Sequence, residues 1–529
     1  MVIASPYPDV SVPEQSLSSF VLADAAERGD KPAIVDGLTG RTLSYRQLAD
    51  DVRQAGCGLR VHGVRKGDVL AMCCPNSPDF AVAYHAALSV GAIVTTINPM
   101  ATPADVAGQL EHSCARWLVT SPELLEKSAL AVAAAGIEQV FVFGEAEGAT
   151  PFAALLHDHG PIDEVAVSPD DFAVLPYSSG TTGLPKGVVL THRGLVANLR
   201  GTAPVHRVGA DDVIVAVLPL FHIYGMQVTM NLGLAAGATI VTMARFELES
   251  FLRILQDWSV TRAEVVPPIV LALAKDPAVE RYDLSSLRIV TSAAAPLGDE
   301  LARLCAERLE CRVKQAYGMT ELGGGTHFAP DDGDDMPESV GRPLPGVECR
   351  VVDCATGADV APGNAGELLV RAPGAMWGYL GDAAATVRTV DADGWLRTGD
   401  VVCVDADSSF FIVDRVKELI KYKAHQVAPA ELEAVLVSHP AVADAAVVGS
   451  PDEEAGEAPK AFVVLRAPAS EEELVGFVAD RVAPYKKIRL LEFVEQIPKS
   501  PSGKILRRVL VERERERACR AAVSVGADR

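Results

Sequence analysis

The sequence predicts an α/β fold with a large N-terminal domain of layered sheets and helices, a small β-barrel subdomain, and a small, mobile α+β domain at the C-terminus. The chain has 529 residues, more than one hydrophobic core usually serves, so at least two domains are expected. Apolar strand-like segments alternate with helical segments through about the first 320 residues, which favours largely parallel sheets. The pattern changes at about Gly341 and again after Arg415. We therefore expect an N-terminal domain over residues 1–415, β-rich from about residue 341, and a C-terminal domain over residues 416–529.

The alternation of strands and helices is clearest in the middle of the N-terminal domain. One unit has a predicted strand at 213–218, a helix after Tyr224 and a strand at 238–243. A second unit has a strand at 262–268, a helix at 269–275 and a strand at 287–294. The longest apolar run, residues 80–97, contains His85, Ser89 and Thr95. These polar residues favour a buried helix followed by a strand over a membrane span.

Short strands separated by Gly, Pro and Asp turns predict the β-rich part of the chain, at 348–353, 366–372 and 409–415. In the C-terminal domain a helix should begin at Pro429, because proline suits the first helical turn and Glu431 follows it. Segments 441–450 and 460–467, a helix at 471–481 and segment 490–496 complete a compact α+β unit. A charged helical tail is expected at 507–520.

Composition and charge exclude several classes of partner. Hydrophobic residues make up 49% of the chain and the net charge is −22, so a globular protein that does not bind nucleic acid is expected. The ten cysteines form no CxxC pair, which favours free thiols in a reducing compartment and gives no support for a metal site. The N-terminus has neither a basic start nor an apolar core, so a soluble, cytoplasmic protein without membrane contact is expected. Monomer and homodimer both remain open.

The segment Tyr177–Gly187, YSSGTTGLPKG, combines glycines, hydroxyl residues and one lysine directly after an apolar strand. Glycines let backbone N–H groups approach an anion, hydroxyls donate hydrogen bonds, and a lysine adds positive charge. The pattern therefore predicts a phosphate-binding loop, although it lacks the GxxxxGK[ST] spacing of the common P-loop. A flexible linker is the alternative, but a buried strand precedes the segment and a helix is expected after Thr191. The candidate phosphate-binding residues are Ser178, Ser179, Gly180, Thr181, Thr182, Gly183 and Lys186.

This loop resembles the signature of the adenylate-forming superfamily, which includes acyl-CoA and aryl-CoA ligases, luciferases and peptide-synthetase adenylation domains. The resemblance covers about residues 15 to 510, and further family motifs follow in the expected order. It implies an enzyme that uses ATP and Mg²⁺, in which the loop holds the β- and γ-phosphates. A non-catalytic nucleotide sensor on the same fold is a rival hypothesis, and the complete set of motifs argues against it.

The next two motifs supply the expected nucleotide and metal contacts. In the segment 315–321, QAYGMTE, the resemblance implies that Tyr317 stacks on adenine, that Thr320 contacts the α-phosphate, and that Glu321 positions Mg²⁺, and Gln315 is a further candidate nucleotide-binding residue. In the segment 395–400, WLRTGD, Asp400 is expected to bind both ribose hydroxyls, since a carboxylate can accept two hydrogen bonds.

The last two motifs belong to the junction of the domains and to the C-terminal unit. Within 414–423, DRVKELIKYK, Arg415 resembles a second ribose contact and Lys417 occupies the hinge position. Lys421 and Gln426 match positions used during adenylation in plant coumarate-type ligases. In the segment 499–507, KSPSGKILR, Lys504 corresponds to the family's catalytic lysine, which would bridge the attacking carboxylate and the α-phosphate.

Two segments bear on the acid substrate. LPLFHIYG at 218–225 and TSAAAP at 291–296 resemble the acid-binding regions of 4-coumarate- and cinnamate-CoA ligases. The implied pocket consists of His222 at its edge, Tyr224, Val228, Thr291, Ala293, Ala294, Gly318 and Gly323. Small residues on one wall leave room for a flat ring, so an aromatic or cinnamate-like acid is favoured. Short- and medium-chain fatty acids are the alternative substrates. Gly324-Gly325 departs from the Pro-Val that is common in plant coumarate ligases.

One departure concerns the second half of the expected reaction. Coumarate-type ligases usually continue after the hinge as Tyr-Lys-Gly-(Phe or Tyr)-Gln-Val, whereas this chain has Ala424 and His425 after Tyr422-Lys423. In the family the glycine leaves room for the pantetheine of CoA, and an alanine adds a Cβ there. An AMP-forming aryl-CoA ligase with CoA as acceptor is the expected activity. The alternative is transfer to an amine or a carrier-protein thiol, or ATP- and nitrite-dependent diazotisation of an aryl amine, with His425 as an acid or base.

Overall fold

The computed structural model describes residues 1–157, 165–178, 185–332, 336–423, 425–452, 455–500 and 503–514. Within these residues the strands form four sheets, and helices pack around them. One hydrophobic core extends from Leu17 to Phe410, and a separate core begins at Ile420 and ends at Ile488. The predicted α/β fold with a small α+β unit at the C-terminal end is confirmed, while the boundary between residues 415 and 416 stays a prediction.

The first sheet carries the predicted phosphate loop at one edge. Its strand order is β10-β11-β9-β5-β4-β6-β7-β8, with β21 paired to β11. The strands are β4 (Val69–Cys73), β5 (Ile93–Thr96), β6 (Trp117–Thr120), β7 (Gln139–Val142), β8 (Thr150–Pro151), β9 (Phe172–Val174), β10 (Tyr177–Ser178), β11 (Lys186–Thr191) and β21 (Gly378–Tyr379). The helices in this part of the chain are α3 (Tyr45–Val61), α4 (Pro78–Ser89), α5 (Pro103–His112) and α6 (Pro122–Ala134). The predicted buried helix and strand within residues 80–97 are therefore α4 and β5.

The second sheet contains the strands predicted in the middle of the chain, in the order β18-β17-β16-β15-β14-β12-β13-β2-β3. They are β2 (Pro32–Asp36), β3 (Thr42–Ser44), β12 (Val213–Ala216), β13 (Thr239–Thr242), β14 (Arg262–Val265), β15 (Ile289–Ser292), β16 (Arg312–Met319), β17 (Gly324–Phe328) and β18 (Arg342–Pro343). The strands from β16 to β2 pair in parallel, as the alternation predicts. Helices α7 (His192–His206), α8 (Leu232–Ala236), α9 (Leu248–Asp257), α10 (Pro267–Lys275) and α11 (Asp299–Leu309) accompany this sheet.

The helix expected after Tyr224 has an unusual form. Residues Tyr224–Asn231 make a π-helix, which continues directly into α8. A π-helix is wider than an α-helix and often occurs at functional sites. It places Tyr224 and Val228 in the interior.

The third and fourth sheets form the later part of the chain. β1 (Ile3–Ala4), β19 (Glu348–Val352), β20 (Gly366–Arg371), β22 (Leu396–Val404) and β23 (Phe410–Arg415) pair antiparallel in that order, with α12 (Ala383–Thr389) beside β21 and β22. The C-terminal sheet has the order β25-β24-β27-β26, with β28 on β27. Its elements are β24 (Ile420–Tyr422), β25 (His425–Val427), α13 (Pro429–Ser438), β26 (Val442–Asp452), β27 (Gly456–Leu465), α14 (Glu471–Ala479) and β28 (Leu490–Phe493). The predicted start of α13 at Pro429 is confirmed, and the helical tail is described only up to residue 514.

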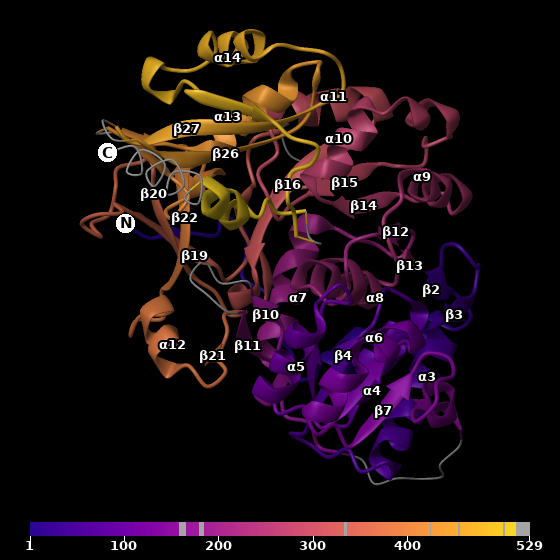
Figure 1. Cartoon of the computed structure of the whole chain (residues 1–529). Coiled ribbons are helices and arrows are strands. Elements are labelled where there is room, and N and C mark those ends of the chain that lie inside the picture. The colour runs from indigo at the N-terminus through magenta and orange to yellow at the C-terminus, as the bar shows by residue number, and fades with distance from the viewer. Residues whose placement is uncertain are drawn as a thin grey trace, which may run out of the picture.

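The C-terminal unit lies against the second sheet and its helices. Figure 1 shows α13 and β26 next to α10, α11 and the ends of β15 and β16. Lys275 at the end of α10 donates a hydrogen bond to the carbonyl of Val437 at 2.9 Å. A Cβ atom placed on Gly298 would lie 3.2 Å from the Cβ of Ala434 in α13. These contacts bring the C-terminal residues to the carboxyl ends of the parallel strands, where α/β sheets commonly bind ligands.

Candidate active site

The two ends of the predicted phosphate loop lie on antiparallel strands. Ser178 on β10 is the register partner of Lys186 on β11. The Oγ of Ser178 donates a hydrogen bond to Oε1 of Glu321 at 2.8 Å. This hydrogen bond therefore connects the predicted phosphate site with the predicted metal ligand. Ser179, Gly180, Thr181, Thr182 and Gly183 lie outside the described residues.

Glu321 lies in the short 3₁₀ helix η4 (Thr320–Leu322), and its side chain is buried. Oε1 accepts a second hydrogen bond, from the hydroxyl of Tyr379 on β21 at 3.0 Å. Lys186 places its Nζ 4.8 Å from the centre of the same tyrosine ring. Sequence reasoning did not identify Tyr379, because it belongs to no motif and reaches Glu321 only through the pairing of β21 with β11.

The surroundings of Glu321 fit a magnesium ion bound mainly by a nucleotide. Among the described residues, no cluster of three or more His, Cys, Asp or Glu side chains could hold a metal on its own. Mg²⁺ at phosphate-transfer sites is usually bound by one or two carboxylates together with substrate phosphates. Both hydrogen bonds to Glu321 use Oε1, so Oε2 can serve as such a ligand.

Tyr317, Asp400 and Arg415 form the nucleoside side of the site. The hydroxyl of Tyr317 donates to Oδ2 of Asp400 at 2.6 Å, and Nε of Arg415 donates to Oδ1 at 3.0 Å. Asp400 and Arg415 are register partners on β22 and β23. Burial and the neighbouring Asp400 carboxylate raise the pKa of Tyr317, so its hydroxyl keeps its proton. A negatively charged acceptor for hydroxyl groups is therefore held in place from two sides.

The side chain of Gln315, a candidate nucleotide-binding residue, forms its hydrogen bonds to backbone groups of the protein. Its Oε1 accepts a hydrogen bond from the N–H of Leu297 at 3.0 Å, and its Nε2 donates to the carbonyl of Leu297 at 3.1 Å. Nε2 also donates to the carbonyl of Pro337 at 2.5 Å. The side chain thus fixes the loop after β15. Thr320, the predicted α-phosphate contact, begins η4 and is buried next to Glu321.

Lys504 reaches the nucleotide residues from the C-terminal unit. Gly503 before it has φ +76°, and a Cβ atom there would lie 2.9 Å from the side chain of Val266, so the loop packs closely on the end of β14. The pKa of Lys504 is lowered by burial and by Arg415, while Asp400 and Glu321 act in the opposite direction. The ammonium group is therefore within electrostatic reach of residues from three separate motifs.

The segment around Lys504 is anchored by Arg507. One guanidinium nitrogen donates to Glu418 at 2.5 Å and another donates to Glu433 in α13 at 2.6 Å. Burial raises the pKa of Glu433 to about 7 despite the opposing effect of Arg507. No role was assigned to Arg507 from the sequence, since an arginine at the end of a motif gives no sign of its partners.

The predicted acid site surrounds Tyr224. Its hydroxyl donates to the carbonyl of Thr291 at 3.0 Å, and its N–H donates to Nδ1 of His222 at 3.3 Å. Burial and the charge of Lys504 lower the pKa of His222 to about 3, so the imidazole is neutral. Val228 and Ala293 are buried beside these residues. His222 thus contacts the predicted acid site and lies within the electrostatic reach of Lys504.

Backbone packing also explains why two of the small residues in this site are glycines. A Cβ atom on Gly318 would lie 2.2 Å from the carbonyl oxygen of Gly324, and one on Gly323 would lie 2.5 Å from the carbonyl oxygen of Gly374. Gly323 also has φ +69°, and Ala294 has φ +73° although it carries a Cβ. Glycine is thus required for backbone packing at 318 and 323, whether or not a substrate ring lies there. A positive φ on an alanine is strained, and such strain occurs mainly at functional sites.

The hinge residues lie on the surface. Lys417 occupies the turn after β23 with an exposed side chain, and Lys421 pairs with Gln426 across β24 and β25, where both are exposed. His425 stacks on the ring of Tyr485 with 4.4 Å between ring centres and 21° between ring planes. Ala424 lies outside the described residues. His425 therefore has a structural contact through its imidazole ring.

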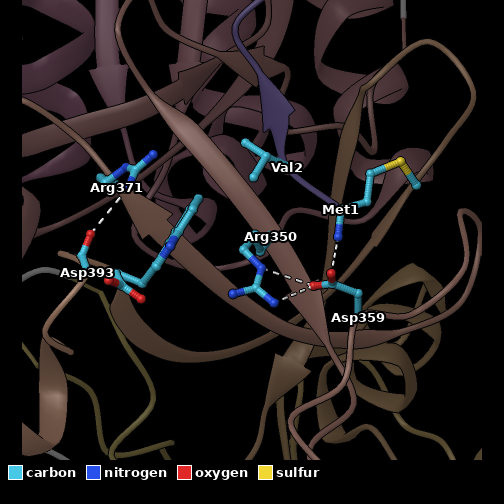
Figure 2. Close-up of a pocket in the computed structure, with 7 residues that line it drawn as sticks. Met1, Val2, Arg350, Asp359, Arg371 and Asp393 are labelled. Carbon is cyan, nitrogen blue, oxygen red and sulfur yellow. Dashed lines mark hydrogen bonds and ion pairs between the residues drawn. The ribbon is translucent and has the colours of Figure 1, made fainter.

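A hollow lies beside the third sheet, and its lining includes Trp395, the first residue of the motif that contains Asp400. It has a volume of about 450 Å³, and Arg350 and Arg371 line it together with Trp395. Figure 2 shows that Arg350 and the amino group of Met1 both bind Asp359. Arg371 likewise pairs with Glu348 at 2.6 Å. Because each arginine already has a carboxylate partner, the hollow offers no free positive charge to an anion.

Comparison with known proteins agrees with the motifs and the fold. Residues 21–380 match the family described as AMP-binding enzyme, and residues 431–504 match the AMP-binding enzyme C-terminal domain. The chain belongs to the AMP-binding enzyme family. No helix in the described segments is long and apolar enough to cross a membrane.

Relatives and solved structures cover almost the whole chain. It is 44% identical to a 4-coumarate–CoA ligase of Pinus taeda over 96% of this chain and 97% of that protein, and 43% identical to 4-coumarate–CoA ligase 5 of Oryza sativa subsp. japonica over 96% of each. The structure of the anthranilate CoA ligase AuaEII with anthranoyl-AMP matches with a TM-score of 0.90 and 28% identity, over 96% of this chain and 99% of that one. The amide bond synthetase McbA of Marinactinospora thermotolerans matches with a TM-score of 0.84 and 28% identity, over 94% and 99%.

Proposed function

We propose that this chain is an AMP-forming aryl-CoA ligase that activates an aromatic or cinnamate-like carboxylic acid with ATP and transfers the acyl group to CoA. The position of Lys504 carries the proposal, because its ammonium group lies within the electrostatic reach of Asp400, Glu321 and Arg415. Family membership and the resemblance to 4-coumarate–CoA ligases along 96% of the chain support it.

In the first half-reaction a carboxylate oxygen of the acid attacks the α-phosphorus of ATP. A new P–O bond forms, the bond to pyrophosphate breaks, and an acyl adenylate results. Lys504 holds the attacking carboxylate and an α-phosphate oxygen together and stabilises the charge that develops between them. Bound Mg²⁺ would neutralise charge on the phosphates, and Glu321 would hold it. Asp400 accepts the ribose hydroxyls, while Tyr317 and Arg415 keep its carboxylate in position.

In the second half-reaction the thiolate of CoA attacks the acyl carbon and a C–S bond forms. The bond between the acyl carbon and the phosphate oxygen breaks, and AMP leaves. The C-terminal unit moves about Lys417 between the two steps, so that Lys504 leaves the site and the segment around His425 enters it. We place the reaction in the cytoplasm, since the nine cysteines of the described residues are all free thiols.

Transfer to an amine is the second candidate. It is favoured by Ala424 and His425 in the segment expected to line the CoA channel, and McbA shows that an amide bond synthetase can have this fold. His425 could take the proton of the attacking amine, although its stacking on Tyr485 already gives it a structural role.

Product analysis separates these proposals. The protein is incubated with Mg²⁺-ATP and cinnamate-type acids, with CoA, with an amine, with nitrite, or with no acceptor. The ligase should release AMP and pyrophosphate and form a thioester only when CoA is present. AMP formation at a rate that does not depend on CoA, together with an amide product, would overturn CoA as the acceptor. ATP binding without any acid-dependent pyrophosphate release would overturn the enzyme and favour a nucleotide sensor.

A further inference from the structure

A row of buried polar side chains lies next to the predicted acid site, and no step of the proposed reaction uses it. Glu264 on β14 is the register partner of Thr291 on β15, and Thr291 is the register partner of Lys314 on β16. Register partners on parallel strands place their side chains on the same face of the sheet. Their exposed fractions are 1%, 0% and 2%, so the row is closed to solvent.

The hydrogen bonds around His206 define which oxygen of Glu264 is occupied. Arg262 donates to Nδ1 of His206 at 3.2 Å, so this nitrogen is an acceptor and the proton resides on Nε2. Nε2 then donates to Oε1 of Glu264 at 3.1 Å. Burial lowers the pKa of His206, which agrees with a neutral imidazole. One oxygen of Glu264 therefore has a partner from the protein.

The charges of this network already balance. Arg262 donates to Asp331 at 2.9 Å, and Lys314 forms an ion pair with the same carboxylate. Burial alone would raise the pKa of Glu264, but His206, Arg262 and Lys314 lower it overall. Glu264 is therefore an ionised, acceptor-only group whose charge is compensated, which suits a neutral hydrogen-bond donor better than a second cation.

Two polar atoms in the row have no hydrogen-bond partner among the described residues, namely Oε2 of Glu264 and Oγ1 of Thr291. The hydroxyl of Tyr224 lies within hydrogen-bonding reach of the Glu264 carboxylate, which adds to the effect of burial in raising the pKa of that tyrosine. However, Tyr224 has a single hydroxyl hydrogen and donates it to the carbonyl of Thr291 at 3.0 Å. Buried polar atoms nearly always have partners, so an acceptor that lacks one here indicates a ligand group.

The distance along β14 agrees with a position at the far end of the acid. Val266, two residues after Glu264 on the same face, contacts the loop that carries Lys504. Two residues of extended strand span about 7 Å. An aromatic ring with a short link to its carboxylate has a comparable length. The carboxylate can therefore meet Lys504 while the far side of the ring meets Glu264.

We propose that Glu264 determines the ring specificity of the acid site, by accepting a hydrogen bond at Oε2 from a neutral hydroxyl or amino group on the ring. Thr291 provides the second partner of that group through Oγ1. This inference rests on the proposed activation of an aromatic acid and adds the substrate class: ring-hydroxylated or ring-amino acids, as opposed to unsubstituted or methoxylated ones.

The first test uses the unaltered protein and four cinnamic acids, which are unsubstituted, hydroxylated, aminated and methoxylated, with the three substituents at one common ring position. The set is measured once with that position at 3 and once with it at 4. The quantity measured is kcat/KM for acid-dependent pyrophosphate release. The better of the hydroxy and amino acids should exceed the unsubstituted and methoxy acids by about 10- to 100-fold, as loss of a hydrogen bond to a charged partner implies. Comparison of the hydroxy and amino arms identifies which donor the site prefers. Equal values across all four acids would overturn the inference while leaving the proposed function intact, whereas no release with any acid would overturn the proposed function itself.

The second test uses the variant Glu264→Gln. The glutamine side chain has the same shape, and its carbonyl oxygen can still accept the hydrogen bond from His206. The ratio of kcat/KM between the donor-bearing acid and the unsubstituted acid should fall at least tenfold, because the amide then presents N–H groups at the former Oε2 position. Asp331→Asn is the matched control, since it disturbs the same charge network through Arg262 and Lys314 while keeping the Glu264 carboxylate, and it should leave this ratio unchanged. The ratio does not depend on the fraction of folded protein. An unchanged ratio in Glu264→Gln, or an equal fall in Asp331→Asn, would contradict the assignment.

Thr291→Val serves as the second variant if Glu264→Gln does not fold. It removes Oγ1 at nearly constant volume and should lower the same ratio severalfold. A ratio equal to that of the unaltered protein would then overturn the inference.

Discussion

Lys504 belongs to the C-terminal unit, yet its electrostatic surroundings are set by Asp400, Glu321 and Arg415 of the preceding strands. Each of these residues comes from a different motif, and the sequence predicts each as part of one nucleotide site. The neutral imidazole of His222 adds no competing charge beside the lysine. A positive group is thus available where the attacking carboxylate and the α-phosphate would meet.

The pH dependence of adenylation should reflect this lysine. Burial, and to a smaller extent the charge of Arg415, lower the pKa of Lys504 below the usual 10.5. The cation is therefore present at low pH and is lost as the pH rises through the lowered pKa. We expect kcat/KM for acid-dependent pyrophosphate release to fall on the basic side of the profile, below pH 10.5. Lys504→Arg stays protonated throughout this range and should be slower but lack this fall. A basic fall that persists unchanged in Lys504→Arg would assign it to another group.

Motif residues could be predicted individually, but their partners could not. Asp400 and Glu321 stand in short patterns whose chemistry is readable from residue type. Tyr379 and Arg507 give no such signal, because they act through contacts across 58 and 74 residues of chain. Glu264 was predicted only as part of a strand, since a lone carboxylate in an apolar segment does not reveal its neighbours.

Among the elements, β16 and β17 approach each other so closely that side chains are excluded between them. A Cβ atom on Gly318 would lie 2.2 Å from the carbonyl oxygen of Gly324 and 2.7 Å from the Cα of Gly325. We expect Gly318→Ala to destabilise the protein by about 3 kcal/mol and to lower its melting temperature, because the added methyl group would clash with the backbone of the neighbouring strand. Thermal unfolding monitored by circular dichroism measures the effect.

Gly108→Ala is the control for that prediction. Gly108 lies in α5 at an exposed position where a Cβ atom would meet nothing within 4 Å. The same methyl group should stabilise the helix there by roughly 0.5–1 kcal/mol. If Gly318→Ala unfolded at the temperature of the unaltered protein and only weakened binding of the acid, the glycine would serve the substrate and not the backbone.

Many elements follow from local patterns, whereas their order in the sheets does not. The alternation of apolar and helical segments predicts β12, β13, β14 and β15, and Pro429 marks the start of α13. Pairing of β1 with β19 joins residues more than 340 positions apart, and no local pattern contains it. The π-helix after Tyr224 likewise depends on its buried surroundings, because its sequence also suits an ordinary helix.

At the scale of the whole molecule, the two units adopt an arrangement suited to the first half-reaction. Contacts of Lys275 with Val437 and of Gly298 with Ala434 hold the C-terminal unit over the second sheet. His425, in the segment proposed to enter the site for the thioester step, is meanwhile exposed. The proposed transfer to CoA would therefore need the C-terminal unit to move.

A disulfide across this contact should stop the motion. A Cβ atom on Gly298 would lie 3.2 Å from that of Ala434, close to the separation of about 3.5–4.5 Å in disulfides. We expect Gly298→Cys combined with Ala434→Cys to lose thioester formation after oxidation and to regain it after reduction. Each single cysteine variant, oxidised in the same way, should keep full thioester activity. Full thioester formation by the oxidised double variant would contradict the proposed motion.

The most direct measurement is acid-dependent incorporation of labelled pyrophosphate into ATP by this oxidised double variant, because exchange requires only the first half-reaction. We predict exchange at a rate near that of the unaltered protein, and its loss by at least a hundredfold when Lys504→Ala is added, with the melting temperature unchanged. Absence of acid-dependent exchange in both the unaltered protein and the oxidised double variant would contradict adenylation, and undiminished exchange with Lys504→Ala would contradict the role of that lysine.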